Sequence, residues 1–468
     1  MRERILLPHI QKCFHHICRD GSVSDMETGA RQCSDVKTLA AILDYHREST
    51  PAGELYQWVL SREEMLRGKD DPVTLSTVCS MANVFVDQGK FDKALEWYRR
   101  ALSGEEKSLG KDHPDTLFTV SSIATVFSQQ GKYDEALEWH RRALAGGEKS
   151  LGVNPDTLST VHRMAIVFRN QGKYDEALKW YRRALAGREK VLGKDHPDTL
   201  STMYSMATVF ANQGKHDEAL EWHRRVLVER EKSLGKGHPD TLSTVYSMAT
   251  VFADQGRYGE ALEWHRRALT GEEKSLGQDH PDTLSTVCSM ANVFVDQGKF
   301  DEALEWYRRA LAGREKSLGK DHPDTLSTVY SMATVFANQG KYDEALEWHR
   351  RALAGEEKSL GEGHPDTLST VYSMATVFAN QGKYDEALEW HRRALAGEEK
   401  SLGKDHPDTL TTIQGIATVL ARQGKYDKAL ELCRQVLAGR EKSLGNDHPY
   451  TLATRRKIAM ILLKQNTE

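Results

Sequence analysis

Cysteine, signal sequences and long apolar runs are scarce or missing in this chain of 468 residues. Its six cysteines follow no disulfide-framework spacing, which favours a reducing compartment. No apolar run approaches the roughly 18 residues of a membrane-spanning helix, and residues 1–8 lack the apolar core of a signal peptide. The net charge is −4, with both signs interspersed, so no basic stripe for nucleic acid stands out. We therefore expect a soluble, cytoplasmic protein that neither inserts into membranes nor binds nucleic acid.

What the chain has in abundance is repetition. Nearly the same sequence recurs along it, and each copy begins with a proline. The interval is 42 residues, except for 41 between the second and third copies. Self-similarity at a fixed period indicates stacked supersecondary units, which bury their apolar faces only against one another. The prolines are Pro72, Pro114, Pro155, Pro197, Pro239, Pro281, Pro323, Pro365, Pro407 and Pro449.

Each copy is predicted to form two helices. In the copy that starts at Pro239, apolar residues recur at i, i+3, i+4 and i+7, which is one stripe of a helix (Val245, Met248, Ala249, Phe252). Pro239 suits a first helical turn, and Gly256 is a suitable C-terminal stop. A second helix is predicted from Tyr258 to about Leu276, with Ala261, Leu262, Trp264, Ala268 and Leu269 on its apolar side.

These residues follow the spacing of the tetratricopeptide repeat, from Met248-Ala249 through Phe252, Gly256 and Tyr258 to Ala261, Ala268 and Pro281. The second helix is eight residues longer than usual. With its Leu-Gly-Lys-Asp-His-Pro junction, the unit resembles the repeats of kinesin light chains and the arrays that end many fungal NACHT or NB-ARC (STAND) proteins. The resemblance covers residues 30 to 463. It implies an all-α, right-handed superhelix (α-solenoid) of about ten helix pairs plus a closing helix.

The expected organisation has four parts. Residues 1–29 form an N-terminal extension, and residues 30–71 a degenerate first repeat that acts as a cap. In that cap Pro51 is predicted to open the second helix, and Ala40, Leu43, Ala52, Val59 and Leu60 occupy the expected apolar places. Residues 72–448 hold nine repeats. Residues 449–468 form a closing helix and tail, whose basic character suits the end of a stack.

The variable places of the first helix are the candidate binding site. They recur at i, i+4, i+7 and i+8, offset from the apolar stripe. In tetratricopeptide proteins this face lines the concave groove that holds extended peptides; the alternative is drift on a solvated surface. The predicted groove residues are Cys79, Asn83, Asp87, Ser121, His162, Arg169, Tyr204, Asn212, Tyr246, Asp254, Cys288, Asn292, Tyr330, Asn338, Tyr372, Asn380 and Gln414, with counterparts that include Val86, Thr125, Ser128, Gln129 and Ile166.

One departure from the kinesin light chains matters for this site. That family commonly carries two consecutive asparagines, which grip the ligand backbone, where this chain has Tyr246-Ser247. The cargo-binding chemistry of kinesin light chains is therefore not expected here. The recurring tyrosines would instead favour stacking and apolar contacts.

Motifs that suggest cofactors or metals do not hold up. Gly104 to Lys111 has the wrong spacing and context for a phosphate loop. Eight loop histidines lie one per repeat, too far apart to share an ion, and are interpreted as helix-entry residues (His113, His196, His238, His280, His322, His364, His406, His448). A zinc site from Cys13, His15, His16 and Cys18, completed by Cys33, is a minor alternative. The tryptophan column is assigned to packing between units, and Gly271, inside a helix, has no firm account.

No catalytic constellation repeats with convergent geometry, so the chain is predicted to be non-catalytic, without cofactor or metal. The favoured function is a scaffold or adaptor that binds protein or peptide segments along its concave face. One alternative is the recognition arm of a STAND-type signalling NTPase whose catalytic domain lies outside this chain. Another is a kinesin-associated cargo adaptor.

Overall fold

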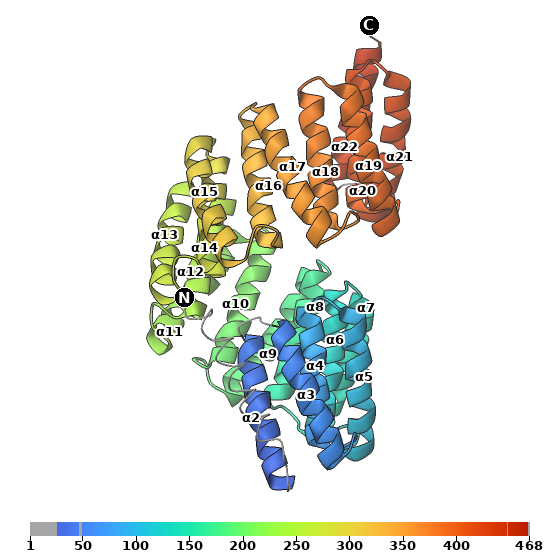
Figure 1. Cartoon of the computed structure of the whole chain (residues 1–468). Coiled ribbons are helices and arrows are strands. Elements are labelled where there is room, and N and C mark those ends of the chain that lie inside the picture. The colour runs from blue at the N-terminus through green and yellow to red at the C-terminus, as the bar shows by residue number, and fades with distance from the viewer. Residues whose placement is uncertain (1–25, 46–48, 447, 467–468) are drawn as a thin grey trace. The chain divides into compact units, whose positions relative to one another are not determined.

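The chain folds into helices packed in consecutive pairs (Figure 1). The computed structural model describes residues 26–45, 49–446 and 448–466, and in these ranges there are 21 helices and no strand, as the all-α prediction requires. The opening pair is α2 (Met26–Tyr45) and α3 (Ser49–Arg67). The helix predicted to open at Pro51 thus begins at Ser49. The last helix is α22 (Pro449–Gln465).

Between these ends lie nine helix pairs of nearly the same lengths, with 18 residues in each second helix except α21, which has 19. Their first helices are α4 (Pro72–Asp87), α6 (Pro114–Gln129), α8 (Pro155–Asn170), α10 (Pro197–Asn212), α12 (Pro239–Asp254), α14 (Pro281–Asp296), α16 (Pro323–Asn338), α18 (Pro365–Asn380) and α20 (Pro407–Arg422). Their second helices are α5 (Phe91–Ser108), α7 (Tyr133–Ser150), α9 (Tyr174–Val191), α11 (His216–Ser233), α13 (Tyr258–Ser275), α15 (Phe300–Ser317), α17 (Tyr342–Ser359), α19 (Tyr384–Ser401) and α21 (Tyr426–Leu444).

Helix boundaries follow from local chemistry that recurs in each copy. His238 is the N-cap of α12, and its Nδ1 accepts the backbone N–H of Asp240 at 3.2 Å. This bond satisfies one of the unpaired donors of a helix start, and Pro239 follows at the first helical position. Gly256 turns the chain with φ of 72°, a left-handed conformation that glycine adopts without strain. The loop histidines are thus helix caps.

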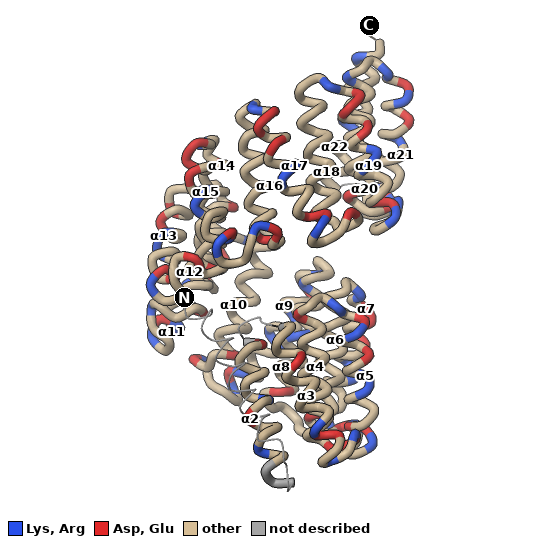
Figure 2. Tube along the Cα trace, in the orientation of Figure 1, with Lys and Arg blue, Asp and Glu red and all other residues tan. Residues whose placement is uncertain are grey.

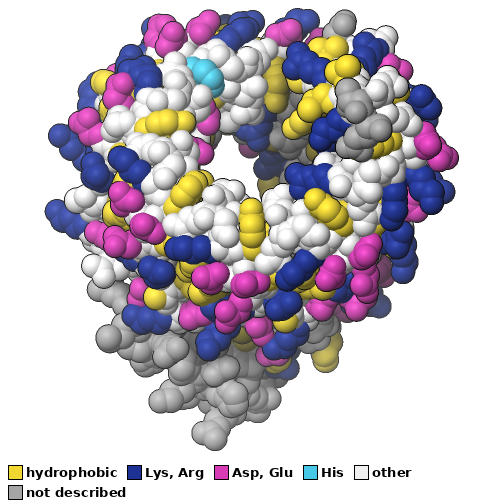
Figure 3. Space-filling model, turned by 90° about the horizontal axis from the view of Figure 1, so that it is seen from above, with side chains coloured by type: hydrophobic (Ala, Val, Ile, Leu, Met, Phe, Trp, Pro, Cys, Tyr) yellow, Lys and Arg dark blue, Asp and Glu magenta, His cyan; other side chains and the backbone are white. Residues whose placement is uncertain are grey.

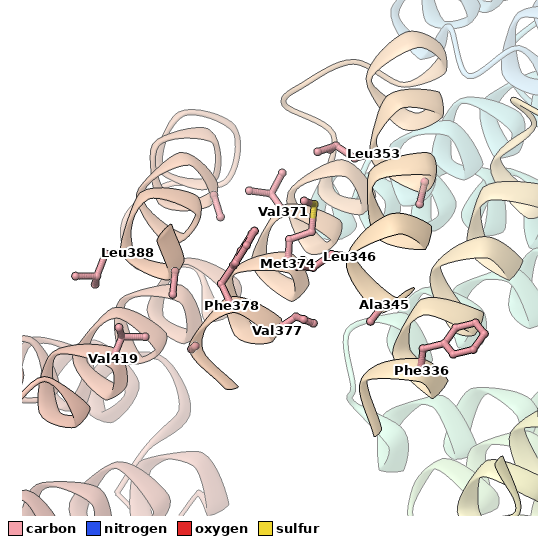
Figure 4. Packing of buried hydrophobic residues seen from close by; sticks show 14 of the residues in the cluster. Phe336, Ala345, Leu346, Leu353, Val371, Met374, Val377, Phe378, Leu388 and Val419 are labelled. Carbon is pink, nitrogen blue, oxygen red and sulfur yellow. The ribbon is translucent and has the colours of Figure 1, made fainter. Parts of the chain in front are cut away.

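The chain divides into two compact units, residues 1–233 and 234–468. In each unit a first helix packs on its own second helix and on the second helix of the repeat before it. In the second unit, Val371 and Met374 of α18 lie beside Leu346 and Leu353 of α17 (Figure 4). The same cluster extends to Leu388 of α19 and Val419 of α20. The apolar core is therefore shared from one repeat to the next.

The apolar stripe predicted from the sequence forms this core. Val245, Met248, Ala249 and Phe252 are at most 1% exposed. In the opening pair, the apolar places named for the degenerate repeat are buried as well: Ala40, Leu43, Ala52, Val59 and Leu60. The closing helix differs from expectation. Alongside its basic residues it exposes a set of apolar side chains, namely Tyr450, Leu452, Met460, Leu462 and Leu463.

The helical glycine that the sequence left without an account marks a close contact between paired helices. A Cβ on Gly271 would lie 2.4 Å from Cδ2 of Leu242 in the partner helix α12. Equivalent glycines meet equivalent leucines in seven of the other eight repeats, for example Gly355 and Leu326 at 2.5 Å, whereas the repeat of α10 and α11 has Glu229 at this place. Backbone and leucine approach so closely that a methyl group does not fit without movement. This contact explains a glycine where alanine would favour the helix by about 1 kcal/mol.

Among the described residues, no helix is both long and apolar enough to cross a membrane.

The glycine contact predicts opposite results for one substitution at two sites in the second unit. Gly355→Ala should destabilise the protein by about 1–3 kcal/mol, because the added methyl overpacks against Leu326. Gly259→Ala, where nothing lies within 4 Å of the new methyl, should stabilise by up to about 1 kcal/mol. Urea unfolding followed by circular dichroism measures both. Equal shifts of the same sign would contradict the account.

Candidate functional site

The predicted groove residues all lie on first helices, at four places per helix that we call the first-helix stripe. For the repeat at Pro239 these are Tyr246, Thr250, Ala253 and Asp254. The structure divides the predicted residues by exposure. Cys79 and Ser121 are buried, at 8% and 3% exposed. Half-buried are His162, Arg169, Tyr204, Tyr246, Cys288, Tyr330, Tyr372 and Gln414; exposed are Asn83, Asp87, Asn212, Asp254, Asn292, Asn338 and Asn380.

Charge is unevenly divided between the two helices of a pair. Figure 2 shows first helices such as α10 and α16 almost entirely without charged residues, whereas second helices carry many. On the face shown in Figure 3, basic and acidic side chains are mixed. In each repeat the stripe is therefore a weakly charged surface beside a strongly charged one.

The recurring tyrosines of the stripe pack against histidines of the second helix. Tyr246 meets His265 edge-on, with ring centroids 5.4 Å apart, and its hydroxyl lies 2.7 Å from Ser289 Oγ in the next repeat. Tyr204, Tyr330 and Tyr372 face His223, His349 and His391 at 5.1 to 5.3 Å. Burial lowers the pKa of these histidines to about 4, so they are neutral packing partners. The tyrosines thus contribute to the fold.

Two repeats use a different set of side chains at the same places. There, cysteine replaces the tyrosine (Cys79, Cys288) and tyrosine replaces the histidine (Tyr98, Tyr307). The tyrosine hydroxyl now donates from the second helix to an asparagine of the stripe, Tyr98 to Asn83 and Tyr307 to Asn292. A large ring on one helix is exchanged for a large ring on the other. The three places therefore vary together, as Tyr-Thr-His in four repeats and Cys-Asn-Tyr in two.

Part of the variation in the stripe is therefore packing compensation. The sequence contained a signal for it, because in six of the nine repeats the second-helix place is histidine where the first-helix place is tyrosine and tyrosine where it is cysteine. That signal becomes interpretable only when the structure puts the two places in contact.

Exchanging the whole set should be tolerated where exchanging one member is not. Tyr330→Cys alone removes a ring that packs on His349 and should cost about 2 kcal/mol. The triple variant Tyr330→Cys, Thr334→Asn, His349→Tyr reproduces the set of Cys288, Asn292 and Tyr307, and should return to within about 1 kcal/mol of the parent. Urea unfolding measures the coupling. Purely additive effects would show that the three places are independent.

A row of buried charged residues, which sequence reasoning missed, lies where one repeat meets the next. Near the end of the second helix the same place holds glutamate in some repeats (Glu105, Glu272, Glu356, Glu398) and arginine in others (Arg188, Arg230, Arg314, Arg440), all at most 8% exposed. Arg314 donates to the Asp324 carbonyl and to Thr328 Oγ1, both at 2.7 Å, in the next first helix. Thr412 Oγ1 donates to Glu398 Oε1 at 3.0 Å.

These carboxyl groups are only partly satisfied. Oε2 of Glu105, Glu272, Glu356 and Glu398 is buried without a hydrogen-bond partner. Burial raises the pKa of Glu272, Glu356 and Glu398 to about 7. No cluster of three or more His, Cys, Asp or Glu residues that could hold a metal occurs in the described part of the chain. The row of buried Glu and Arg side chains thus links the second helix of one repeat to the first helix of the next.

A pocket of about 320 Å³ lies on the stripe of three neighbouring first helices in the first unit, α4, α6 and α8. Six of its lining residues occupy stripe places, namely Asn83, Val86, Thr125, Ser128, Gln129 and Ile166. The others, which the sequence did not single out, are Tyr98, Phe118, Ser122, Val126, His140, Arg163 and Val167. The stripe is therefore hollowed at this point.

The remaining motifs have structural explanations. Trp264 stacks on Phe252 of its own repeat, with ring centroids 6.3 Å apart, and Cζ of Arg267 lies over the Trp264 ring, 5.1 Å from its centroid. The tryptophans thus stack within their own repeat, and Trp306, Trp348 and Trp390 also pack against the core cluster that neighbouring repeats share, as the predicted packing between units requires. Gly104, which begins the segment that resembles a phosphate loop, lies inside α5 against Leu75. Cys13, His15, His16 and Cys18 lie outside the described residues, and Cys33 is buried.

Comparison with known proteins identifies the repeats. The tetratricopeptide repeat family model matches residues 52–149, 156–227, 204–274, 240–316, 282–358, 324–397, 366–442 and 411–467. With the stacked helix pairs, this match confirms the predicted solenoid class. No curated protein matches the chain.

Three solved structures are similar to it. Nearly identical tetratricopeptide-like repeats from Podosopora anserina, assigned to a kinesin light chain, are 27% identical, with coverage of 44% of this chain and 97% of that chain and a TM-score of 0.40. BtubC from P. vanneervenii is 20% identical (55% and 94% covered, TM-score 0.40). The apo form of RapI is 17% identical (61% and 98% covered, TM-score 0.45). TM-scores this low give no basis for transferring function.

Proposed function

Because the chain belongs to the tetratricopeptide repeat family, we propose that it is a non-catalytic scaffold that binds extended protein or peptide segments on the first-helix stripe. The observation that carries this proposal is an exposed, uncharged amide that recurs at one place on a weakly charged helix face. Asn170, Asn212, Asn338 and Asn380 occupy this place in four repeats and are exposed.

The chemistry of these places suits a peptide backbone. An asparagine side chain offers two donors and an acceptor, so it can pair with both the N–H and the C=O of an extended segment. Asn83 and Asn292 are exposed one turn earlier in their helices, although each also accepts a bond from a tyrosine. Asn338 and Asn380, in successive repeats of the second unit, are therefore suited to pair with one extended segment, whereas the half-buried tyrosines contribute mainly to packing.

A cytoplasmic location is part of the proposal. The four cysteines in the described residues, Cys33, Cys79, Cys288 and Cys433, are free thiols. Free thiols are usual in proteins of a reducing compartment.

A capture experiment tests the stripe directly. The purified chain and a triple variant, Asn212→Ala, Asn338→Ala and Asn380→Ala, are used to capture partners from lysate of the source cells, and the captured proteins are quantified by mass spectrometry. Exposed asparagines contribute little to stability, so the variant should fold like the parent. We expect partners bound by the stripe to fall by about tenfold in recovery.

The matched control changes three exposed residues on second helices of the same repeats, Glu221→Ala, Glu347→Ala and Glu389→Ala. It should keep the partners that the stripe variant loses. If the control loses its partners while the stripe variant keeps them, the binding surface lies on the second helices and the proposal fails.

A further inference from the structure

Two neighbouring repeats of the first unit depart from the others at two places that line one pocket and at a third that contacts its lining. Phe118 stands where seven other repeats have serine and one has threonine, and it is 55% exposed at the pocket. Ser121 stands where four repeats have tyrosine. Arg163 stands where seven repeats have serine and one has glycine. Phe118 and Arg163 line this pocket, and the buried Ser121 accepts a hydrogen bond from Arg163, so the departures set this pocket apart.

The contact between Ser121 and Arg163 replaces a tyrosine–serine contact that is found in the second unit. In the second unit, Tyr246 reaches across to Ser289 of the next repeat. In the first unit the small Ser121 takes the tyrosine's place, and Arg163 reaches back from the next repeat to donate to Ser121 Oγ at 3.1 Å. Arginine thus occupies the space that the tyrosine ring fills elsewhere. His140 lines the same pocket and is neutral, since burial and the nearby Arg163 lower its pKa to about 3.

The charge of Arg163 is the next feature of the pocket. A guanidinium has five N–H donors, and Ser121 takes one of those of Arg163. Among the described residues, Tyr98 is the one group that acts electrostatically on the pKa of Arg163, and no carboxylate does so. Burial lowers its pKa, but an arginine stays charged at physiological pH. The charge of Asp87 helps to raise the pKa of the Tyr98 hydroxyl, and Asp87 is not part of the pocket lining. The pocket therefore holds a cation without a counter-charge.

The rest of the lining is apolar or carries hydroxyl and amide groups. Val86, Phe118, Ile166 and Val167 supply apolar surface, and Tyr98, Ser122 and Asn83 supply hydrogen-bonding groups. We propose that this pocket binds a carboxylate carried on an apolar group, with Arg163 as its counter-charge. A small aliphatic or aromatic acid and an acidic residue flanked by apolar residues in a peptide share this chemistry. The peptide source rests on the function proposed above, whereas the small-acid source does not.

Restoring the consensus residues gives a variant that removes the charge and keeps the packing. Ser121→Tyr with Arg163→Ser recreates the pair formed by Tyr246 and Ser289, so it should fold. Arg182→Ser, at an exposed site in α9, removes the same charge outside the pocket and is the matched control. Urea unfolding confirms that all three proteins are folded.

Binding is measured by ligand-observed NMR with two arms of probes. The first arm compares 3-phenylpropanoate and hexanoate with their uncharged amides. The second compares the capped tripeptide acetyl-Leu-Asp-Leu-amide with acetyl-Leu-Asn-Leu-amide. The proposal predicts that the parent and Arg182→Ser bind the carboxylate in at least one arm about tenfold more tightly than the amide, and that the double variant loses this preference. The arm that responds identifies the source.

Two results would overturn the proposal. One is equal binding of carboxylate and amide, or no binding of either, in both arms. The other is a preference that survives in the double variant. Neither result bears on the asparagines of the stripe, whose capture experiment uses other residues and other partners, so failure of the pocket and failure of the proposed function remain distinguishable.

Discussion

The rest of the structure depends on burial of the apolar stripe of each first helix between its own second helix and the neighbouring repeat. A single pair cannot cover this stripe, so the pairs must stack. One close point of the contact is the glycine that lies against a leucine, as Gly355 does against Leu326. Near this contact the buried Glu or Arg of the second helix meets the threonine of the next first helix, as in Arg314 and Thr328. Stacking therefore constrains most of the residues that recur.

This constraint explains how far the sequence could be interpreted alone. The period, the apolar stripe and the glycine stops are local features, so the helices, their pairing and the solenoid class were predictable. Contacts between paired helices are not local. The coupling of Tyr246 with His265, and of Cys288 with Asn292 and Tyr307, needed the structure to become visible. The same holds for the pocket that contains Arg163, since its lining comes from five helices.

The structure also changes the view of the variable places. Variation at the tyrosine place accompanies variation in the second helix, so it reflects packing at least in part. The exposed asparagines carry no such coupling within the repeats at Pro197, Pro323 and Pro365, and they are the better candidates for ligand contact. Two alternative functions depend on segments other than the repeats. They are a recognition arm of a STAND-type NTPase and a kinesin-associated adaptor. The repeat structure bears on neither, and both stay hypotheses.

The central claim is that partners contact the first-helix stripe, and site-specific photo-crosslinking tests it most directly. Benzoylphenylalanine is placed at Asn338 of the stripe in one protein and at Glu347 of the second helix in another, both exposed positions of one repeat. After irradiation in source-cell lysate, crosslinked partners are identified by mass spectrometry. The account predicts a specific partner crosslinked from position 338 and none from position 347. Crosslinks from position 347 alone would contradict it.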